Sequence, residues 1–268
     1  MELIDTHSHI YAEEFDGDRE EALARARAEG VGKLLLPAID AESDERMFDL
    51  ARAEAGYCYA MMGLHPTSVN DNPRWREELQ RVERYFAAPP AGVEFCAVGE
   101  IGLDYYWSED FKAEQREAFV EQCRLAVRLD LPVVIHTRSA WDDMCDILEA
   151  ETTRAQESGG RLRGVLHAFS EDAATYERLR ACGDFLFGIG GVVTFKKSAL
   201  AEVVKQMRLE DLVVETDAPY LTPAPHRGTR NESSYVRFVA MKIAELKEVD
   251  YEVVAEQTTA NAKRIFNL

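Results

Sequence analysis

Short apolar runs alternate with longer charged stretches along the whole chain. The runs are rich in β-branched and aromatic residues, which is typical of buried strands. We predict strands at residues 2–6, 33–39, 57–64, 94–100, 132–137, 163–168, 185–190 and 212–217. The stretches between them place apolar residues three and four positions apart, which is typical of amphipathic helices. We predict helices at residues 18–28, 42–54, 73–87, 110–130, 140–157, 171–182, 196–207, 232–246 and 251–265.

Strands that alternate with helices indicate βα units and a parallel sheet. Eight such units in 268 residues predict an α/β fold, a (β/α)8 TIM barrel, for which about 250 residues is typical. A doubly wound open sheet is the alternative. No linker rich in Pro, Gly or Ser divides the sequence, so we expect a single domain over residues 1–268.

Histidines and carboxylates, the residue types that bind metal ions, stand at the ends of the apolar runs. Five of the six histidines do so, and two carboxylates end further runs; the set is His7, His9, His65, Glu100, His136, His167 and Asp217. An open sheet collects its ligands at one switch point, whereas a barrel gathers the ends of all its strands at one mouth. Because these residues come from nearly all of the predicted strands, their distribution favours the barrel.

Charge and cysteine content narrow the functional classes. The net charge is −18, from 31 basic and 49 acidic residues, which argues against a protein that coats long duplex nucleic acid. An enzyme that contacts a few phosphates remains compatible with this charge. Five widely spaced cysteines without a Cys-x-x-Cys pair indicate reduced, structural thiols. No apolar segment approaches the roughly 20 residues of a membrane helix. With no secretory signal at the N-terminus, we expect a cytoplasmic protein without a membrane partner.

The histidines and carboxylates suit a metal centre. His7 and His9 lie two positions apart, so on a strand both side chains project to the same face. Four imidazoles and two carboxylates are enough for one crowded ion or two adjacent ions, although each histidine alone has a structural alternative. Imidazole suits zinc, whereas carboxylate and water suit magnesium or manganese, so the ligand types leave the metal open. A paired site can activate water for attack on phosphorus or carbonyl carbon.

Further polar and aromatic residues lie near these positions in the sequence. We expect His65 beside the metals, as a hydrogen-bond donor to substrate or as a structural residue. Arg138, Arg227 and Arg230 are candidates to bind phosphate oxygens, with a structural role in capping the last helices as the alternative for the second and third. Tyr105, Tyr106 and Trp107 follow Glu100 and either stack on a base or pack a loop onto the barrel.

Several segments in this order resemble the TatD-type metal-dependent hydrolases, a family of cytoplasmic DNases on a metal-binding TIM barrel. They are residues 4–9 (IDTHSH), 63–66 (GLHP), 98–105 (VGEIGLDY), 136–138 (HTR), 167–170 (HAFS), 215–221 (ETDAPYL) and 230–232 (RNE). The resemblance implies that His7, His9, Glu100, His136, His167 and Asp217 bind metal, with Glu100 as the bridging ligand.

The implied activity is divalent-metal-dependent hydrolysis of phosphodiesters, typically exonucleolytic and best on single-stranded DNA or DNA ends. We therefore expect two divalent ions, Mg²⁺ with Mn²⁺ or Zn²⁺ as alternatives, and DNA as the partner, with no obligate protein partner. In this scheme Glu100, Asp217 and His65 are the catalytic residues, and Asp217 orients or deprotonates the attacking water.

The sequence departs from the family pattern at three positions. The family usually has Asp, Gly and Pro where this chain has Ser139, Glu171 and Ser233. All three lie outside the expected ligands, so they bear on substrate details rather than on the metal site.

Two other functions remain as alternatives. A related metal-dependent amidohydrolase or deacylase would act on small amides, esters or aminoacyl-tRNA; many such barrels bridge their metals with a modified lysine at the fourth strand, where this chain has Glu100. A binding protein on an inactive barrel would lack a ligand, and none is missing.

Overall fold

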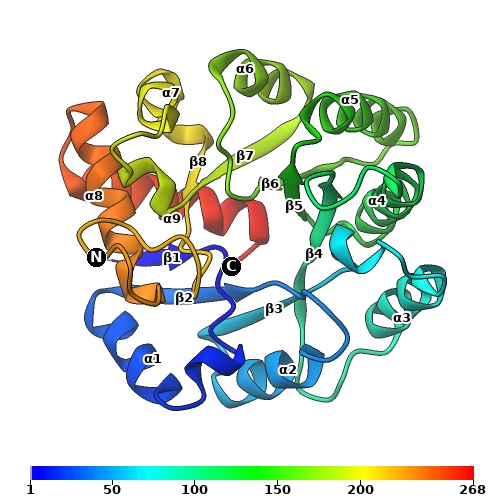
Figure 1. Ribbon diagram of the computed structural model, residues 1–268, viewed down its shortest axis with the longest axis horizontal. Coiled ribbons are helices and arrows are strands. Elements are labelled where there is room, and N and C mark those ends of the chain that lie inside the picture. The colour runs from blue at the N-terminus through cyan, green and yellow to red at the C-terminus, as the bar shows by residue number, and fades with distance from the viewer. Residues whose placement is uncertain (1) are drawn as a thin grey trace.

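Eight parallel strands form one sheet in the computed structural model, which describes residues 2–268 (Figure 1). The strands follow one another around the sheet in chain order, each hydrogen-bonded to the next. They are β1 (Leu3–Asp5), β2 (Val31–Leu36), β3 (Cys58–Met62), β4 (Phe95–Asp104), β5 (Val133–Arg138), β6 (Arg163–Leu166), β7 (Asp184–Ile189) and β8 (Leu212–Val214). The predicted TIM barrel is confirmed.

Helices form a ring outside the strands, except for the last helix, which lies across one end of the barrel (Figure 1). They are α1 (Arg19–Ala28), α2 (Asp44–Ala53), α3 (Trp75–Ala87), α4 (Lys112–Leu129), α5 (Trp141–Glu157), α6 (Ala173–Cys182), α7 (Leu200–Gln206), α8 (Val236–Lys247) and α9 (Tyr251–Phe266). Short 3₁₀ helices lie in the loops, at Glu13–Phe15, Pro66–Ser68, Gly191–Thr194, Leu209–Asp211 and Ser233–Tyr235. All nine predicted helices are present, and the seventh and eighth each begin four residues later than expected. In the described part of the chain, no helix is both long and apolar enough to cross a membrane.

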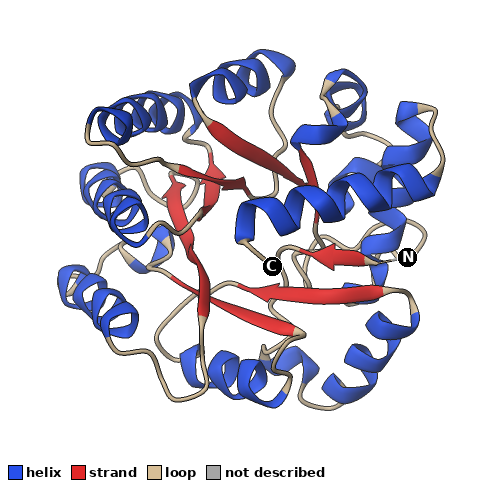
Figure 2. Ribbon diagram, turned by 180° about the vertical axis from the view of Figure 1, so that it is seen from behind, coloured by secondary structure: helices blue, strands red, loops and turns tan. Residues whose placement is uncertain are grey.

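The inside of the barrel is a layer of one apolar side chain from each strand. These are Ile4, Leu35, Met61, Ala97, Val134, Val165, Leu186 and Val213, none more than 1% exposed. Ala262, Ile265 and Phe266 of α9 pack against the same layer. Figure 2, seen from behind, shows α9 crossing the barrel at the end where the strands begin. That end is therefore closed, and the end where the strands finish is left for a site.

The barrel closes between the first and last strands through residues just beyond them. The amide of Thr6 donates to the carbonyl of Val214 (3.1 Å), and the amide of Asp217 donates to the carbonyl of His7 (2.9 Å). Ser8 and Ala218 form a parallel bridge. This pairing puts the segment that carries His7 and His9 directly beside the segment that carries Asp217.

Most strands differ by a few residues from the predicted ranges, and the differences at the ends of β4 and β8 affect the site. Strand β4 runs four residues past Glu100 to Asp104, because a shift of register near Gly99 lets the pairing with β5 continue. Gly102 makes this possible: its φ is 145°, and a Cβ there would overlap the carbonyl of His136. Strand β8 ends at Val214, so Asp217 lies in the turn that follows, with a φ of 58°.

Candidate metal centre

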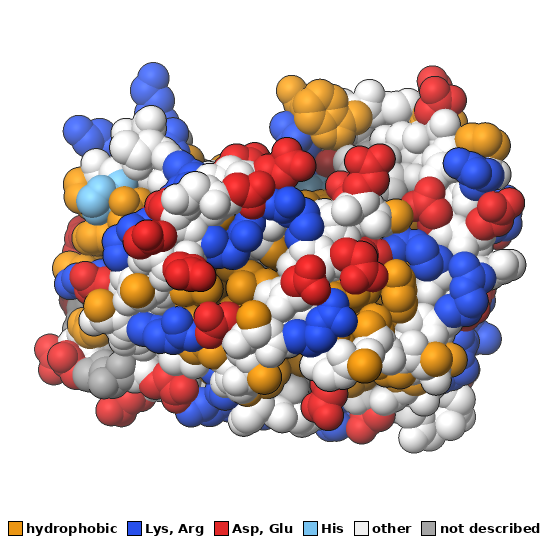
Figure 3. Space-filling model, turned by 90° about the horizontal axis from the view of Figure 1, so that it is seen from below, with side chains coloured by type: hydrophobic (Ala, Val, Ile, Leu, Met, Phe, Trp, Pro, Cys, Tyr) orange, Lys and Arg blue, Asp and Glu red, His pale blue; other side chains and the backbone are white. Residues whose placement is uncertain are grey.

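The histidines and carboxylates predicted from the strand ends come together at the open end of the barrel. They come from six different strands or the turns directly after them, and they are His7, His9, His65, Glu100, His136, His167 and Asp217. Alternate side chains of a strand point to the same face, a period of two residues. This explains two of the positions, because His136 and His167 lie two residues beyond Val134 and Val165 of the inner layer. In Figure 3 this face is the upper edge, hollowed between two raised shoulders, with Asp and Glu side chains on the near rim.

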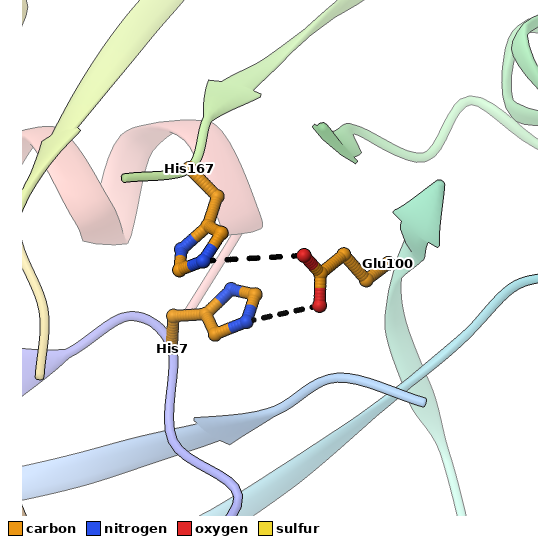
Figure 4. Close-up of side chains that lie close together, drawn as sticks. All are labelled: His7, Glu100 and His167. Atoms are coloured by element: carbon orange, nitrogen blue, oxygen red, sulfur yellow. Dashed lines mark ion pairs between the residues drawn. The ribbon is translucent and has the colours of Figure 1, made fainter. Parts of the chain in front are cut away.

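Glu100 is the central carboxylate. Its Oε2 lies 3.2 Å from Nε2 of His7. Its Oε1 lies 3.1 Å from Nδ1 of His136, 3.6 Å from Nε2 of His65 and 3.9 Å from Nε2 of His167. Figure 4 shows His7 and His167 side by side, each directed at one oxygen of the carboxylate; their rings stack with centroids 3.4 Å apart. The two oxygens of Glu100 therefore face different groups of histidines.

Asp217 is the second carboxylate and the more open of the two. Its side chain is 16% exposed, whereas that of Glu100 is 4% exposed. Its Oδ1 lies 3.4 Å from Nε2 of His9, 3.6 Å from Nε2 of His167 and 3.9 Å from Nε2 of His7. Because Asp217 has more access to solvent, it is better placed than Glu100 to contact a substrate or a water molecule.

Two buried carboxylates that the sequence analysis did not select hold the outer sides of the histidine rings. Oε1 of Glu215 lies 2.9 Å from Nδ1 of His167 and also accepts the amide of Ala168. Oδ2 of Asp104 lies 2.9 Å from Nε2 of His136. Carboxylates in such positions fix the orientation of ligating imidazoles. Period two could have indicated Glu215, two residues beyond Val213 of the inner layer; Asp104 required the full length of β4.

Asp5 and Ser8 hold the segment of His7 and His9 in place through buried hydrogen bonds. Asp5 accepts the amide of Thr216 (2.9 Å) and its hydroxyl (2.7 Å), which ties β1 to the turn after β8. Burial raises the pKa of Asp5 to about 7. The hydroxyl of Ser8 is 2.9 Å from that of Ser233, and both side chains are fully buried. Ser233, one of the departures from the family pattern, therefore contacts the segment that carries the two histidines.

The two central carboxylates remain ionised despite their burial. Burial favours the neutral acid, but the surrounding imidazoles outweigh it, His136 by donating a hydrogen bond, and hold the pKa of Glu100 well below its usual range. Burial also opposes ionisation of Asp217, and a hydrogen bond from His9 outweighs it, so that this pKa too is lowered. Both groups are thus negatively charged at neutral pH.

The histidines fall into two classes. Burial lowers the pKa of His7 and of His65, which favours their neutral forms. Burial acts on His136 and His167 in the same direction, but their carboxylate partners outweigh it and raise these pKa values to about 9 and about 10. Without a cation, the last two rings therefore carry the positive charge that balances the carboxylates.

The donor set fits divalent metal ions. Three groups of ligating atoms each lie within 4.8 Å of one another: His7 with Glu100 and His167, His7 with His9 and Asp217, and His65 with Glu100 and His136. The ring of His7 is completely buried, yet neither of its nitrogens makes a hydrogen bond to any residue that the structure describes. Buried polar atoms without partners are costly, and a metal ion would satisfy them. All six predicted ligands occur in these groups, and so does His65.

The sequence matches the model of the family described as TatD related DNase over residues 4–267. The chain belongs to the TatD family of metal-dependent hydrolases. It is 39% identical over 273 residues to the metal-dependent hydrolase YabD of Bacillus subtilis, with 99% of each chain covered. It is also 39% identical over 277 residues to the metal-dependent hydrolase TatD of Mycobacterium tuberculosis, with 99% of this chain and 98% of the relative covered.

A solved structure agrees with this assignment. The crystal structure of YjjV, a TatD homolog from Escherichia coli K12, superposes with a TM-score of 0.87 at 31% identity, covering 99% of this chain and 98% of that chain. The resemblance read from the motifs is therefore confirmed. The roles of individual residues as ligands remain predictions.

The three arginines expected to bind phosphate have different surroundings in this TatD-family protein. Arg230 forms a two-pronged ion pair with Asp18 (2.7 Å for each contact). Arg227 lies 3.6 Å over the ring of Phe195 and donates to a backbone carbonyl. The side chain of Arg138 makes no hydrogen bond or ion pair to any of residues 2–268, and its guanidinium lies over aromatic rings. The expected role stays a prediction for all three; of them only Arg230 is paired with a carboxylate among residues 2–268.

The other two departures from the TatD pattern lie on the turns around the mouth. Ser139 follows β5 in a left-handed conformation, with a φ of 55°. Glu171 follows β6, and its pKa is raised by partial burial and by the adjacent Asp172. Neither side chain makes a hydrogen bond or an ion pair with the metal-binding groups, as expected from their positions in the sequence.

Proposed function

We propose that this protein is a divalent-metal-dependent deoxyribonuclease that hydrolyses phosphodiester bonds exonucleolytically in single-stranded DNA or at DNA ends. The observation that supports this most is the position of Glu100, whose Oε2 contacts His7 and whose Oε1 contacts His136. A carboxylate in that position can bridge two cations, and paired cations are the usual catalysts of phosphodiester hydrolysis. We propose Mg²⁺ as the native ion, with Mn²⁺ and Zn²⁺ as alternatives.

The residues of the chain divide the work in this proposal. Bound cations would supply Lewis-acid polarisation of the phosphate and a lowered pKa for water. Asp217, ionised and partly open to solvent, accepts a hydrogen bond from the attacking water and orients it. His65, beside Glu100, donates a hydrogen bond to a phosphate or leaving-group oxygen. Arg138, stacked on Tyr106, contributes one positive charge at the rim.

The acidic surface supports a substrate that touches the protein at few phosphates. With a net charge of −18, the chain offers no broad basic face for a duplex. Arg230 is already paired with Asp18, which leaves Arg138 and Arg227 as the candidate phosphate contacts among the three arginines. A single strand or an end that reaches the mouth with one or two phosphates avoids the acidic surface, whereas a long duplex laid across it does not.

The test is hydrolysis of end-labelled single-stranded DNA by metal-stripped protein, with Mg²⁺, Mn²⁺ or Zn²⁺ added back. We expect laddered shortening that requires metal and is lost in the double variant His7→Ala/His9→Ala. Asp217→Ala should lower turnover by at least about 100-fold while the circular dichroism spectrum stays unchanged. No cleavage with any ion, by protein shown to bind metal, would refute the nuclease and direct the search to amide and ester substrates.

A further inference from the structure

Exposed aromatic rings are concentrated at the mouth of the barrel. Among residues 2–268, the exposed large aromatic side chains are Tyr106 (57%), Trp107 (67%) and Tyr220 (52%). The first two follow β4 directly and the third follows β8, so all three lie on the loops that surround the metal-binding groups. In Figure 3 one shoulder of the hollow ends in hydrophobic side chains. A concentration of this kind indicates a binding surface, because single exposed apolar residues are otherwise scattered.

Tyr106 and Trp107 form one unit with Arg138, which we call the Arg138 platform. The guanidinium of Arg138 lies 3.6 Å from the ring centroid of Tyr106 and 5.5 Å from that of Trp107. The two rings meet edge to face, with centroids 5.1 Å apart at 84°. Packing of the loop onto the barrel does not require them, because Tyr105 does that: it is 7% exposed, and its hydroxyl donates to Asp143.

The platform is joined to the metal-binding groups through Asp104. One oxygen of this carboxylate is 2.9 Å from Nε2 of His136, and the other accepts the amide of Tyr106 (3.0 Å). Arg138 pairs with Asp104 across the β4–β5 ladder and lies two residues beyond His136, about 6.6 Å along the strand. A flat group attached to a phosphate at the metal centre can therefore reach the platform.

We propose that the Arg138 platform is a subsite for one unpaired nucleobase next to the phosphate that is cleaved; this rests on the proposed nuclease function. The base stacks on Trp107 and on the guanidinium of Arg138, which also faces the neighbouring phosphate. Every base has a π-face, so the subsite accepts any sequence. Inside a duplex both faces of a base are covered by its neighbours, so only single strands and ends offer a free face. The platform thereby selects the form of the DNA rather than its sequence.

The test compares a short single-stranded oligonucleotide with the same oligonucleotide made abasic on both sides of the cleaved linkage. We expect Trp107→Ala and Arg138→Gln to raise KM for the normal oligonucleotide about 5- to 100-fold, with kcat within about twofold. The abasic oligonucleotide should show a raised KM with wild-type protein and no further increase with Trp107→Ala. Trp107→Phe should restore a KM near wild type, and Val253→Ala, on the exposed side of α9, should change neither constant.

Equal increases of KM for both oligonucleotides would refute the subsite and assign Trp107 a structural role. Fluorescence separates this result from a failure of the nuclease proposal. Trp75 is buried and Trp141 partly buried, so Trp107 is the tryptophan most open to quenching. A cleavage-resistant phosphorothioate oligonucleotide should quench the emission, and its abasic form should not. Wild-type protein that cleaves no DNA but shows this base-dependent quenching would refute the nuclease alone; absence of quenching would overturn the platform.

Discussion

A buried hydrogen bond between Ser8 and Ser233 joins the segment of His7 and His9 to the 3₁₀ helix Ser233–Tyr235. Ser8 stands between His7 and His9, and its hydroxyl is 2.9 Å from that of Ser233. Both side chains are fully buried. Replacing Ser233 by alanine removes one hydrogen bond and leaves the hydroxyl of Ser8 without that partner in a dry environment. Such a loss costs about 1–3 kcal/mol, so we expect Ser233→Ala to lower the free energy of unfolding by about 2 kcal/mol.

The double variant separates this contact from local packing. Ser8→Ala should cost about as much as Ser233→Ala, for the same reason. Once both hydroxyls are gone, neither serine leaves the other unsatisfied, so the double variant should lose about 2 kcal/mol rather than about 4 kcal/mol. The expected coupling is therefore about 2 kcal/mol.

A proline at position 233 provides a second comparison, since the resemblance to the family suggests that residue there. Ser233 opens a 3₁₀ helix, where the φ of proline is favoured. The preceding Glu232 has φ −150° and ψ 158°, which a following proline also allows. Ser233→Pro still loses the hydrogen bond, but it restricts the unfolded chain, which stabilises by about 0.4–1 kcal/mol. We expect it to be less destabilised than Ser233→Ala by that amount.

The assay is urea unfolding of chelator-treated protein followed by circular dichroism, with equal m-values required across the variants. Coupling below about 0.5 kcal/mol would show that the two hydroxyls do not stabilise each other, and the reasoning would fail. A proline variant less stable than the alanine variant would refute the argument about the backbone, while leaving the argument about the hydrogen bond intact.

Three further predictions concern the metal centre. Metal affinity should rise with pH between 7 and 9, because His136 and His167, with pKa values of about 9 and about 10, must lose protons before they bind a cation. Calorimetry at several pH values should show a shallower rise of affinity in Glu215→Gln than in wild type. Equal slopes of affinity against pH in the two proteins would contradict the role given to Glu215. A divalent ion at 100 times its Kd should raise the free energy of unfolding by about 2.7 kcal/mol, reversibly on chelation; a melting temperature that no ion changes would argue against a metal centre. Gly102→Ala should lower the free energy of unfolding in urea by roughly 2–4 kcal/mol, because a Cβ would overlap the carbonyl of His136 at a φ that disfavours side chains. A decrease below about 0.5 kcal/mol would show that the backbone of β4 adjusts easily.

The elements and the central residues of the site could be predicted because they depend on local pattern. Alternating runs set the strands and helices, and the barrel brings strand ends together whatever the loops do. This is why the sequence alone was enough to place residues as distant along the chain as His7 and Asp217 at one mouth. The lengths of β4 and β8 could not be predicted, because they depend on a shift of register at Gly99 and on the pairing across the barrel seam.

The carboxylates Glu215 and Asp217 show what a sequence pattern cannot predict, which is the surroundings of each side chain. Glu215 and Asp217 are two residues apart, so period two assigns both to the same face. In the structure, β8 has ended before either residue, and the left-handed turn at Asp217 gives the two carboxylates different surroundings. Glu215 is buried against His167, and Gly188 leaves the space that its carboxylate occupies. That space is set by a different strand, so the pattern around residue 215 can place Glu215 on the inner face but cannot show that it supports His167.

The surroundings of the arginines at the mouth also depend on residues that are distant in the sequence. The sequence does not distinguish the three arginines, but the ability of each guanidinium to bind a phosphate depends on partners far along the chain. Arg230 is paired with Asp18, 212 residues away, and its charge is already compensated. Arg138 has aromatic neighbours instead of a carboxylate, so its charge is not cancelled by an ion pair. In a protein with a net charge of −18, attraction for DNA cannot come from the number of basic residues. It must come from the few positive charges left uncompensated at the mouth, together with the cations that the histidines and carboxylates would bind.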